Sequence, residues 1–174
     1  MKRDYFLWGL GGFAFTSLTG TLLHFLFDLS GGKLWAAVIS GVNESTWEHM
    51  KLLFFPMLIF AVVQYFFFGE RKDFWCIQLR SILLGQILIP VLFYTYNGAI
   101  GPSPDWLNIS IFFLTALISY WYQTKLYRRE DTPCLSPALA LGILCAMALL
   151  FGLFAFFPPK IGLFLDPVTQ TYGI

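Results

Sequence analysis

Five long apolar runs dominate this 174-residue chain, and they restrict the folds that it can adopt. About 20 predominantly apolar residues in a helix cross the hydrocarbon core of a bilayer. The runs are therefore expected to be transmembrane helices, at residues 5–27, 51–68, 77–96, 106–122 and 137–157. Because the connections between them are short, we expect an all-α polytopic membrane bundle, with residues 1–174 as a single integral membrane domain.

The composition agrees with a membrane protein and excludes one class of partner. Hydrophobic residues make up 57% of the chain and charged residues only 12%, whereas soluble domains carry roughly 25% charged residues. The net charge of +1 provides no basic surface for nucleic acid. The lipid bilayer is therefore the expected surrounding, and no nucleic-acid partner is expected.

The basic residues predict an orientation, since Lys and Arg concentrate on the cytoplasmic side. A cytoplasmic N-terminus places eight of the eleven bases inside and three outside. The eight are Lys2, Arg3, Arg71, Lys72, Arg80, Lys125, Arg128 and Arg129, and the three are Lys33, Lys51 and Lys160. With five spans, the C-terminus is then extracytoplasmic.

The chain before the second run predicts a helix break. One helix over residues 34–68 would be about 52 Å long, which is too long for a simple span. Gly41 disfavours a helix interior, Asn43 is a good N-cap, and the Ser45-x-x-Glu48 pattern is a capping box. We expect a break between Ser40 and Glu44, a short interfacial or re-entrant helix before it, and a helix N-terminus that could bind an anion.

Ionisable residues gather at this break, at the outer level of the membrane. Such residues are costly near lipid and are a functional-site hypothesis by default. Helical spacing places Glu44, Glu48 and Lys51 on one face, and His24 and Asp28 stand four residues apart at the end of the first run. Glu48 and Glu44 are the candidate catalytic bases. The candidate ligand-binding residues are His24, Asp28, Asn43, His49, Lys51, Asn97 and Asp166.

A divalent metal such as zinc is one possible cofactor, with His24, His49 and Glu48 as its ligands. The spacing matches no standard metal motif. The alternative is structural, with Glu48 paired to Lys51.

Other segments suggest packing. Residues 158–174 form an extracytoplasmic tail rich in large apolar side chains, which should pack back on the bundle. Small residues in the first and fifth runs are seams for close helix packing, and could hold a membrane partner or a second copy. Cys76 and Cys134 fall near the inner face and Cys145 within the fifth run, so none lies where a disulfide could persist, and a cysteine metal or redox site is not expected.

Three segments together resemble a family of small bacterial membrane proteins of unknown function. They are Asn43-Glu-Ser-Thr-Trp-Glu-His-Met-Lys51, the upstream His24, and the closing run from Asp166 to Ile174. The resemblance covers nearly the whole chain. It implies a multi-pass protein of the bacterial cytoplasmic membrane, and no reaction or site residues.

Three functions remain open. The first is binding or transport of a small solute or ion through an outward-facing polar pocket, favoured by the broken second helix. The second is a metal-assisted hydrolase of a lipid-like or envelope substrate. The third is an accessory membrane protein in which the polar cluster is structural.

Overall fold

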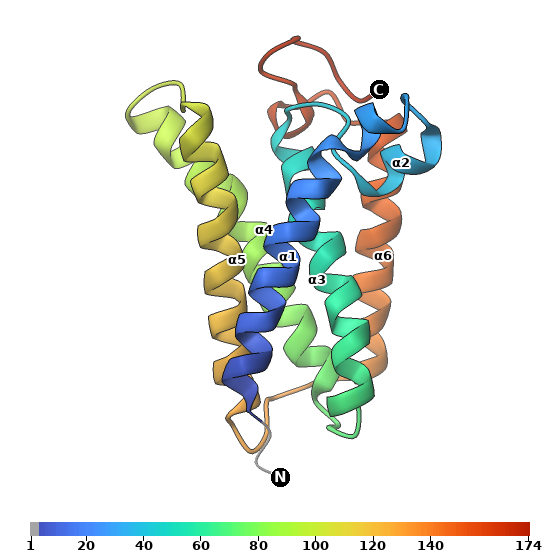
Figure 1. Ribbon diagram of the computed structural model, residues 1–174, viewed down its shortest axis with the longest axis vertical. Helices are drawn as coiled ribbons and strands as arrows, with labels where there is room; N and C mark the ends of the chain where they lie inside the picture. The colour runs from blue at the N-terminus through green and yellow to red at the C-terminus, as the bar shows by residue number, and fades with distance from the viewer. Residues whose placement is uncertain (1–3) are drawn as a thin grey trace.

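The computed structural model describes residues 4–174, and these are helical apart from short connections and a C-terminal segment. Five long helices run along a common axis, with the start of α1 at one end and the C-terminus at the other (Figure 1). The elements are α1 (Tyr5–Leu29), α2 (Leu34–Ile39), α3 (Thr46–Phe68), α4 (Phe74–Ala99), α5 (Asp105–Tyr127), α6 (Pro137–Phe156) and the short 3₁₀ helix η1 (Gly162–Phe164). Lys2 and Arg3, counted in the predicted orientation, lie outside the described residues.

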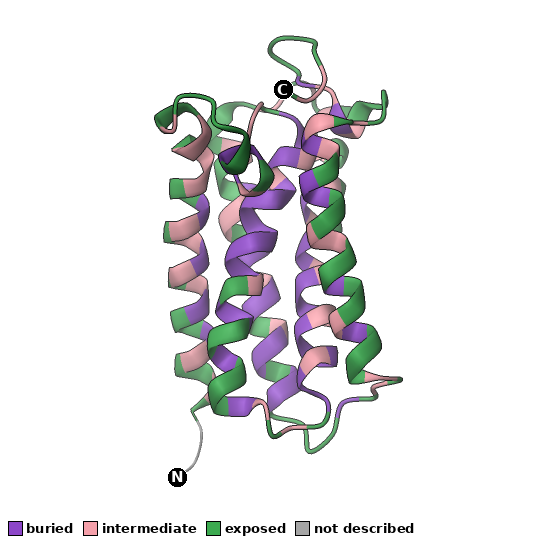
Figure 2. Cartoon of the chain, turned by 90° about the vertical axis from the view of Figure 1, so that its right-hand side faces the viewer, coloured by how far each residue is buried: buried purple, intermediate pink, exposed green. Residues whose placement is uncertain are grey.

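Four helices, α1, α3, α4 and α6, are long and apolar enough to cross a membrane. The outward faces of the bundle carry exposed apolar side chains, such as Phe66 and Leu149, while the buried residues face inward (Figure 2). Large exposed apolar surfaces are rare on soluble monomers, so these features indicate a lipid environment. The helix α5 has 23 residues, as many as α3, but it is less apolar, and a count of five spans stays a prediction.

The predicted helix break is present. The backbone is not helical from Ser40 to Ser45, and the Ser45 hydroxyl accepts a bond of 3.4 Å from the Glu48 amide at the start of α3. Asn43 lies two residues before Ser45, and its side-chain oxygen accepts a 2.9 Å bond from the Ser45 backbone amide. The Glu48 carboxylate accepts from the Val42 amide at 3.0 Å instead of completing the capping box.

The helix α1 packs closely against the rest of the bundle through glycines. A Cβ atom at Gly20 would lie 2.5 Å from the Phe112 ring of α5 and 2.7 Å from the Leu52 carbonyl oxygen of α3. Gly11 faces open space, as does Gly142 on α6. The glycine seam of α1 is thus used at least partly within this chain, and a seam on α6 for a second protein stays a prediction.

Three buried glutamines join α3, α4 and α5 in a closed ring. Gln78 donates to Gln64 at 2.8 Å, Gln64 donates to Gln123 at 3.2 Å, and Gln123 donates back to Gln78 at 2.7 Å. The Tyr127 hydroxyl also accepts a bond from Gln78 at 2.8 Å. Amides in an apolar interior must find partners, and here each satisfies the next across three helices.

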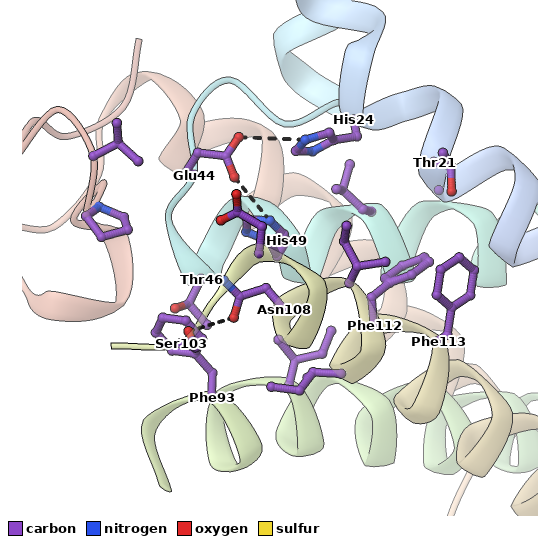
Figure 3. A pocket seen from close by; sticks show the side chains of 18 of the residues that line it. Thr21, His24, Glu44, Thr46, His49, Phe93, Ser103, Asn108, Phe112 and Phe113 are labelled. Carbon is purple, nitrogen blue, oxygen red and sulfur yellow. Dashed lines mark hydrogen bonds and ion pairs between the residues drawn. The ribbon is translucent and has the colours of Figure 1, made fainter. Parts of the chain in front are cut away.

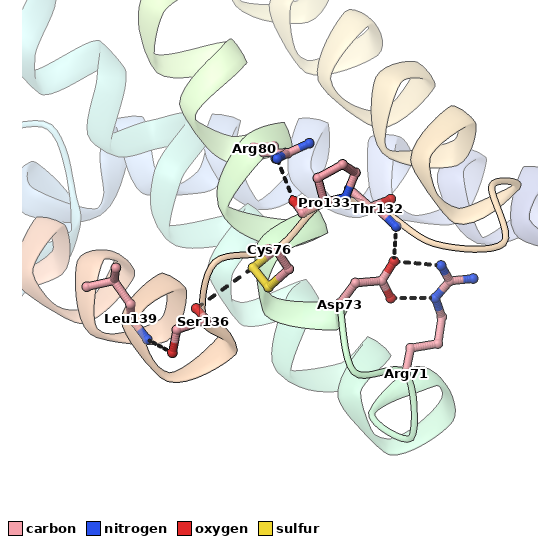
Figure 4. Close-up of a disulfide and its surroundings, with 9 residues drawn as sticks. Arg71, Asp73, Cys76, Arg80, Thr132, Pro133, Ser136 and Leu139 are labelled. Atoms are coloured by element: carbon pink, nitrogen blue, oxygen red, sulfur yellow. Dashed lines mark hydrogen bonds and ion pairs between the residues drawn. A yellow bond between two sulfur atoms is a disulfide. The ribbon is translucent and has the colours of Figure 1, made fainter.

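The end of the bundle opposite α2 is closed by a disulfide between Cys76 and Cys134, whose Cα atoms are 5.7 Å apart (Figure 4). We expected no cysteine to lie where a disulfide could persist, whereas the structure joins these two. Two cysteines 58 residues apart meet because the segment after α5 folds back over the first turn of α4.

The fold-back is held by polar contacts. The Asp73 carboxylate accepts two bonds from Arg71, at 2.8 and 2.9 Å, and one from the Thr132 amide at 2.9 Å. Arg80 donates to the carbonyl oxygen of Pro133, beside Cys134. Sequence spacing gave no sign of these contacts.

The segment after α6 returns to the bundle at the same end as α2 (Figure 1). Phe164 is buried, and its ring centroid lies 4.7 Å from that of Trp47. The side-chain nitrogen of Asn43 donates to the Gly173 carbonyl oxygen at 3.0 Å, and the Ile174 backbone amide donates to the Ala155 carbonyl oxygen at 3.2 Å. This segment therefore covers the loop that precedes α3.

Candidate functional site

A cavity of about 670 Å³ opens between α1, α3, α4 and α5 at the end that carries α2. Its walls are mostly aromatic and aliphatic, with a polar group at the α3 end. The lining residues include Phe25, Phe93, Phe112, Phe113, Ile109, Leu52, Thr21, Thr46, His24, Glu44, His49, Asn97, Ser103, Asp105 and Asn108. A volume of this size suits a small organic molecule.

Two histidines from different helices converge on one carboxylate at the cavity wall (Figure 3). Nε2 of His24 lies 3.7 Å from one Glu44 oxygen, and Nε2 of His49 lies 3.5 Å from the other. The two imidazole centroids are 5.8 Å apart. The Glu44 side chain is 48% exposed and so can still be reached from the cavity.

The hydrogen bond made by Nδ1 of His49 determines whether Nε2 of a neutral His49 is a donor or an acceptor. Nδ1 lies 3.0 Å from the Ser45 carbonyl oxygen. A carbonyl oxygen can only accept, so Nδ1 must carry the proton, and a neutral His49 then has a bare lone pair on Nε2. In that state the lone pair and the Glu44 carboxylate are two acceptors only 3.5 Å apart.

The opposite wall is built by the connection between α4 and α5, and its polar groups are largely paired with one another. The side-chain nitrogen of Asn97 donates to the Phe93 carbonyl oxygen at 2.7 Å, and its side-chain oxygen accepts from the Ser103 backbone amide at 2.9 Å. The Ser103 hydroxyl donates to Asn108 at 2.8 Å. These bonds tie the wall together, whereas Glu44 and His49 lie at the other side of the cavity.

Glu48 lies elsewhere. Its carboxylate is 2.7 Å from the Lys51 ammonium, and both side chains are almost fully buried. Lys51 also donates to the Ala37 carbonyl oxygen of α2 at 2.8 Å. The prediction that Glu44 shares a helix face with these two residues was wrong, because α3 begins at Thr46 and Glu44 precedes it.

The other candidate residues have structural partners or lie outside the cavity lining. Asn43 bonds to Ser45 and Gly173. Asp166 is buried and bonds to Val168 and Thr169 within its own turn. Asp28 is exposed and is not part of the lining.

The acidic residues at the start of α3 bear on two further expectations. The first helical turn contains Glu48, and Glu44 precedes it, so this N-terminus faces carboxylates and does not favour an anion. Among residues 4–174, no group of three or more His, Cys, Asp or Glu side chains is arranged to hold a metal. Glu48 is paired with Lys51, so the expected His24–His49–Glu48 ligand set is not assembled.

The comparisons with known proteins bear on the whole chain. Residues 2–174 match a family described as a family of unknown function (DUF6512). The chain belongs to this family. No curated protein and no solved structure matches it. Membership in DUF6512 therefore agrees with the expected family of unknown function and assigns no reaction, and the site must be interpreted from its own geometry.

Several cavity residues escaped sequence reasoning. Phe93, Phe112 and Phe113 are three of twenty phenylalanines in the chain, and nothing in their spacing distinguishes a cavity wall from a lipid-facing surface. Asp105 and Asn108 lie at the start of α5, where only their polarity beside an apolar run was a signal.

Proposed function

We propose that this protein binds a small solute in an outward-facing pocket, with Glu44 and His49 as its polar anchor and His24 beside them. One observation carries the proposal: the Glu44 carboxylate and Nε2 of His49 lie 3.5 Å apart in the wall of a 670 Å³ cavity, and both are hydrogen-bond acceptors when His49 is neutral. A solute that donates one hydrogen bond to each of them would satisfy both groups.

The apolar surroundings strengthen this anchor. Phenylalanine side chains occupy much of the remaining wall, so a bound solute would be largely removed from water, and a polar interaction gains strength in a less polar medium. Capture on one side of the membrane fits the position of the cavity at one end of the bundle. The five-span topology, the cytoplasmic N-terminus and the bacterial membrane belong to the same proposal, with the cavity on the extracytoplasmic side.

Thermal stability in detergent tests the binding, because a ligand that binds only the folded state raises its stability. A panel of small amines, alcohols, sugars, carboxylates and metal ions would be compared on wild type and on Glu44→Gln. Glu130→Gln is the matched control, since Glu130 is an exposed carboxylate at the opposite end. We expect at least one class to raise the melting temperature of wild type and control and to leave Glu44→Gln unchanged. A panel without any Glu44-dependent shift would refute the proposal.

The side on which the cavity opens needs a separate test. Asn108→Cys in a Cys145→Ser background places a thiol in the cavity wall. A membrane-impermeant maleimide should label this variant in intact cells. Labelling only after the membrane is broken would place the cavity on the cytoplasmic side.

A further inference from the structure

We infer that the solute of this pocket is a protonated amine carrying an apolar group, an inference that rests on the proposed function and narrows it to one chemical class. The argument combines the charge of the lining, the pair of acceptors at the anchor and the aromatic walls.

The charge of the lining favours a cation. Glu44 and Asp105 are carboxylates, and none of the described residues that line the cavity is Lys or Arg. Lys51 is close in sequence to the lining residues, but its side chain is fully buried and bonded to Glu48 and to the Ala37 carbonyl oxygen. An anion entering the cavity would meet two negative groups and no fixed positive one, so electrostatics select against it.

The two acceptors of the anchor, Glu44 and His49, favour a solute with charged N–H donors. With His49 neutral, an ammonium beside the Glu44 carboxylate and His49 Nε2 can donate one N–H group to each, since the two acceptors are 3.5 Å apart, and it also brings a positive charge. Hydrogen bonds of this kind are roughly twice as strong as those between neutral groups. An alcohol could donate to only one of the two acceptors, because a hydroxyl has a single proton.

The walls suit the rest of such a molecule. Figure 3 shows Phe93, Phe112 and Phe113 around the cavity on the side away from the Glu44 group. Aromatic faces attract cations and accept apolar groups. A primary ammonium attached to an apolar group therefore matches both ends of the cavity. The ethanolamine headgroup of a lipid offers the same ammonium without the apolar group, and it is the second source to be tested.

Matched probes test this inference. Benzylamine carries the ammonium, benzyl alcohol is its neutral analogue, benzoate is the anionic one, and benzyltrimethylammonium keeps the charge without N–H donors. We expect benzylamine to bind wild type roughly tenfold or more tightly than the other three. Glu44→Gln should lose this preference, while Glu130→Gln keeps it.

The possible results separate the ammonium inference from the proposed pocket. Equal binding of benzyl alcohol, or tighter binding of benzoate, overturns the ammonium class but leaves the pocket, provided that the wider solute panel shows Glu44-dependent shifts. If neither the probes nor the panel give such shifts, both proposals fail. Benzyltrimethylammonium binding as tightly as benzylamine would overturn the role assigned to the N–H donors and hence this inference.

Nanodiscs of two lipid compositions distinguish a free amine from a lipid headgroup as the source of the ammonium. In nanodiscs of phosphatidylglycerol, benzylamine should stabilise the protein if the inference holds. In nanodiscs that contain phosphatidylethanolamine, the same shift indicates a free amine as ligand, and a lost shift indicates that the lipid headgroup already fills the site. No stabilisation in either membrane would contradict the inference.

Discussion

The Glu48 carboxylate and the Lys51 ammonium lie 2.7 Å apart within one turn of α3, and solvent reaches almost none of either side chain. The pair also bonds to the Val42 amide and the Ala37 carbonyl oxygen. It therefore ties α2 and the loop after it to the start of α3. This role is structural, and it leaves Glu44 as the carboxylate beside the two histidines of the cavity.

Breaking this pair should destabilise the protein, and removing both charges should restore much of the loss. Glu48→Gln or Lys51→Met leaves one buried charge without a counter-ion, which costs about 3–5 kcal/mol. The double variant buries no net charge, and its melting temperature should lie well above those of the single variants. If the double variant is as unstable as the sum of the singles, the clamp interpretation is wrong.

Gly20→Ala should destabilise the bundle by about 1–3 kcal/mol, because the added Cβ would push α1 away from Phe112 and from the α3 backbone. Gly11→Ala is the matched control, since that position faces open space. The control should be neutral or slightly stabilising, as alanine is the better helix former. Thermal unfolding in one detergent gives both values, and a neutral Gly20→Ala would contradict the close approach of the helices.

The Arg71–Asp73 contact should give a pH dependence of stability. Burial alone would raise the pKa of Asp73, but the bonds from Arg71 and the Thr132 amide outweigh it and lower that pKa. A carboxyl group whose pKa is lowered in the folded state stabilises the folded state at pH values above its pKa in the unfolded chain, which is about 3.9. This contribution disappears as the pH falls through the lower folded value. Asp73→Asn should therefore be less stable than wild type at neutral pH, with a gap that narrows below about pH 4. A gap that stays constant with pH would exclude this linkage.

The disulfide provides a test of orientation. Cys76 and Cys134 lie at the end that carries most of the basic residues, which is cytoplasmic in the proposed topology, and the cytoplasm keeps thiols reduced. Differential alkylation in rapidly quenched cells should therefore find all three cysteines free. In protein purified under oxidising conditions, only Cys145 should react before reduction. A bond already formed in quenched cells would reverse the orientation.

The sequence predicted the long helices and the break before α3 because apolar length and capping residues act locally. It also placed His24 and His49 at the same level, and the structure brings their rings to 5.8 Å. It could not tell Glu44 from Glu48, since that depends on where the helix begins. With Thr46 as the first helical residue, Glu44 is free of helical spacing and turns to the histidines, whereas Glu48 lies beneath α2.

Contacts between segments far apart in the chain were the other feature that could not be predicted from the sequence. The glutamine ring and the disulfide join residues far apart in the chain, and neither has a local pattern. A glutamine in an apolar run indicates a buried partner, but three such residues on three helices form a ring only when the helices adopt the right rotation and depth. Those are properties of the packed bundle.

The bond from Asn43 to Gly173 spans 130 residues, and this sets an order of assembly. The loop before α3 leaves the ribosome early, but its amide finds its partner only after α6 has been made. Until then the wall next to Glu44 is incomplete. The chain can thus be inserted helix by helix, while this part of the pocket wall is completed only after residue 173 has been made.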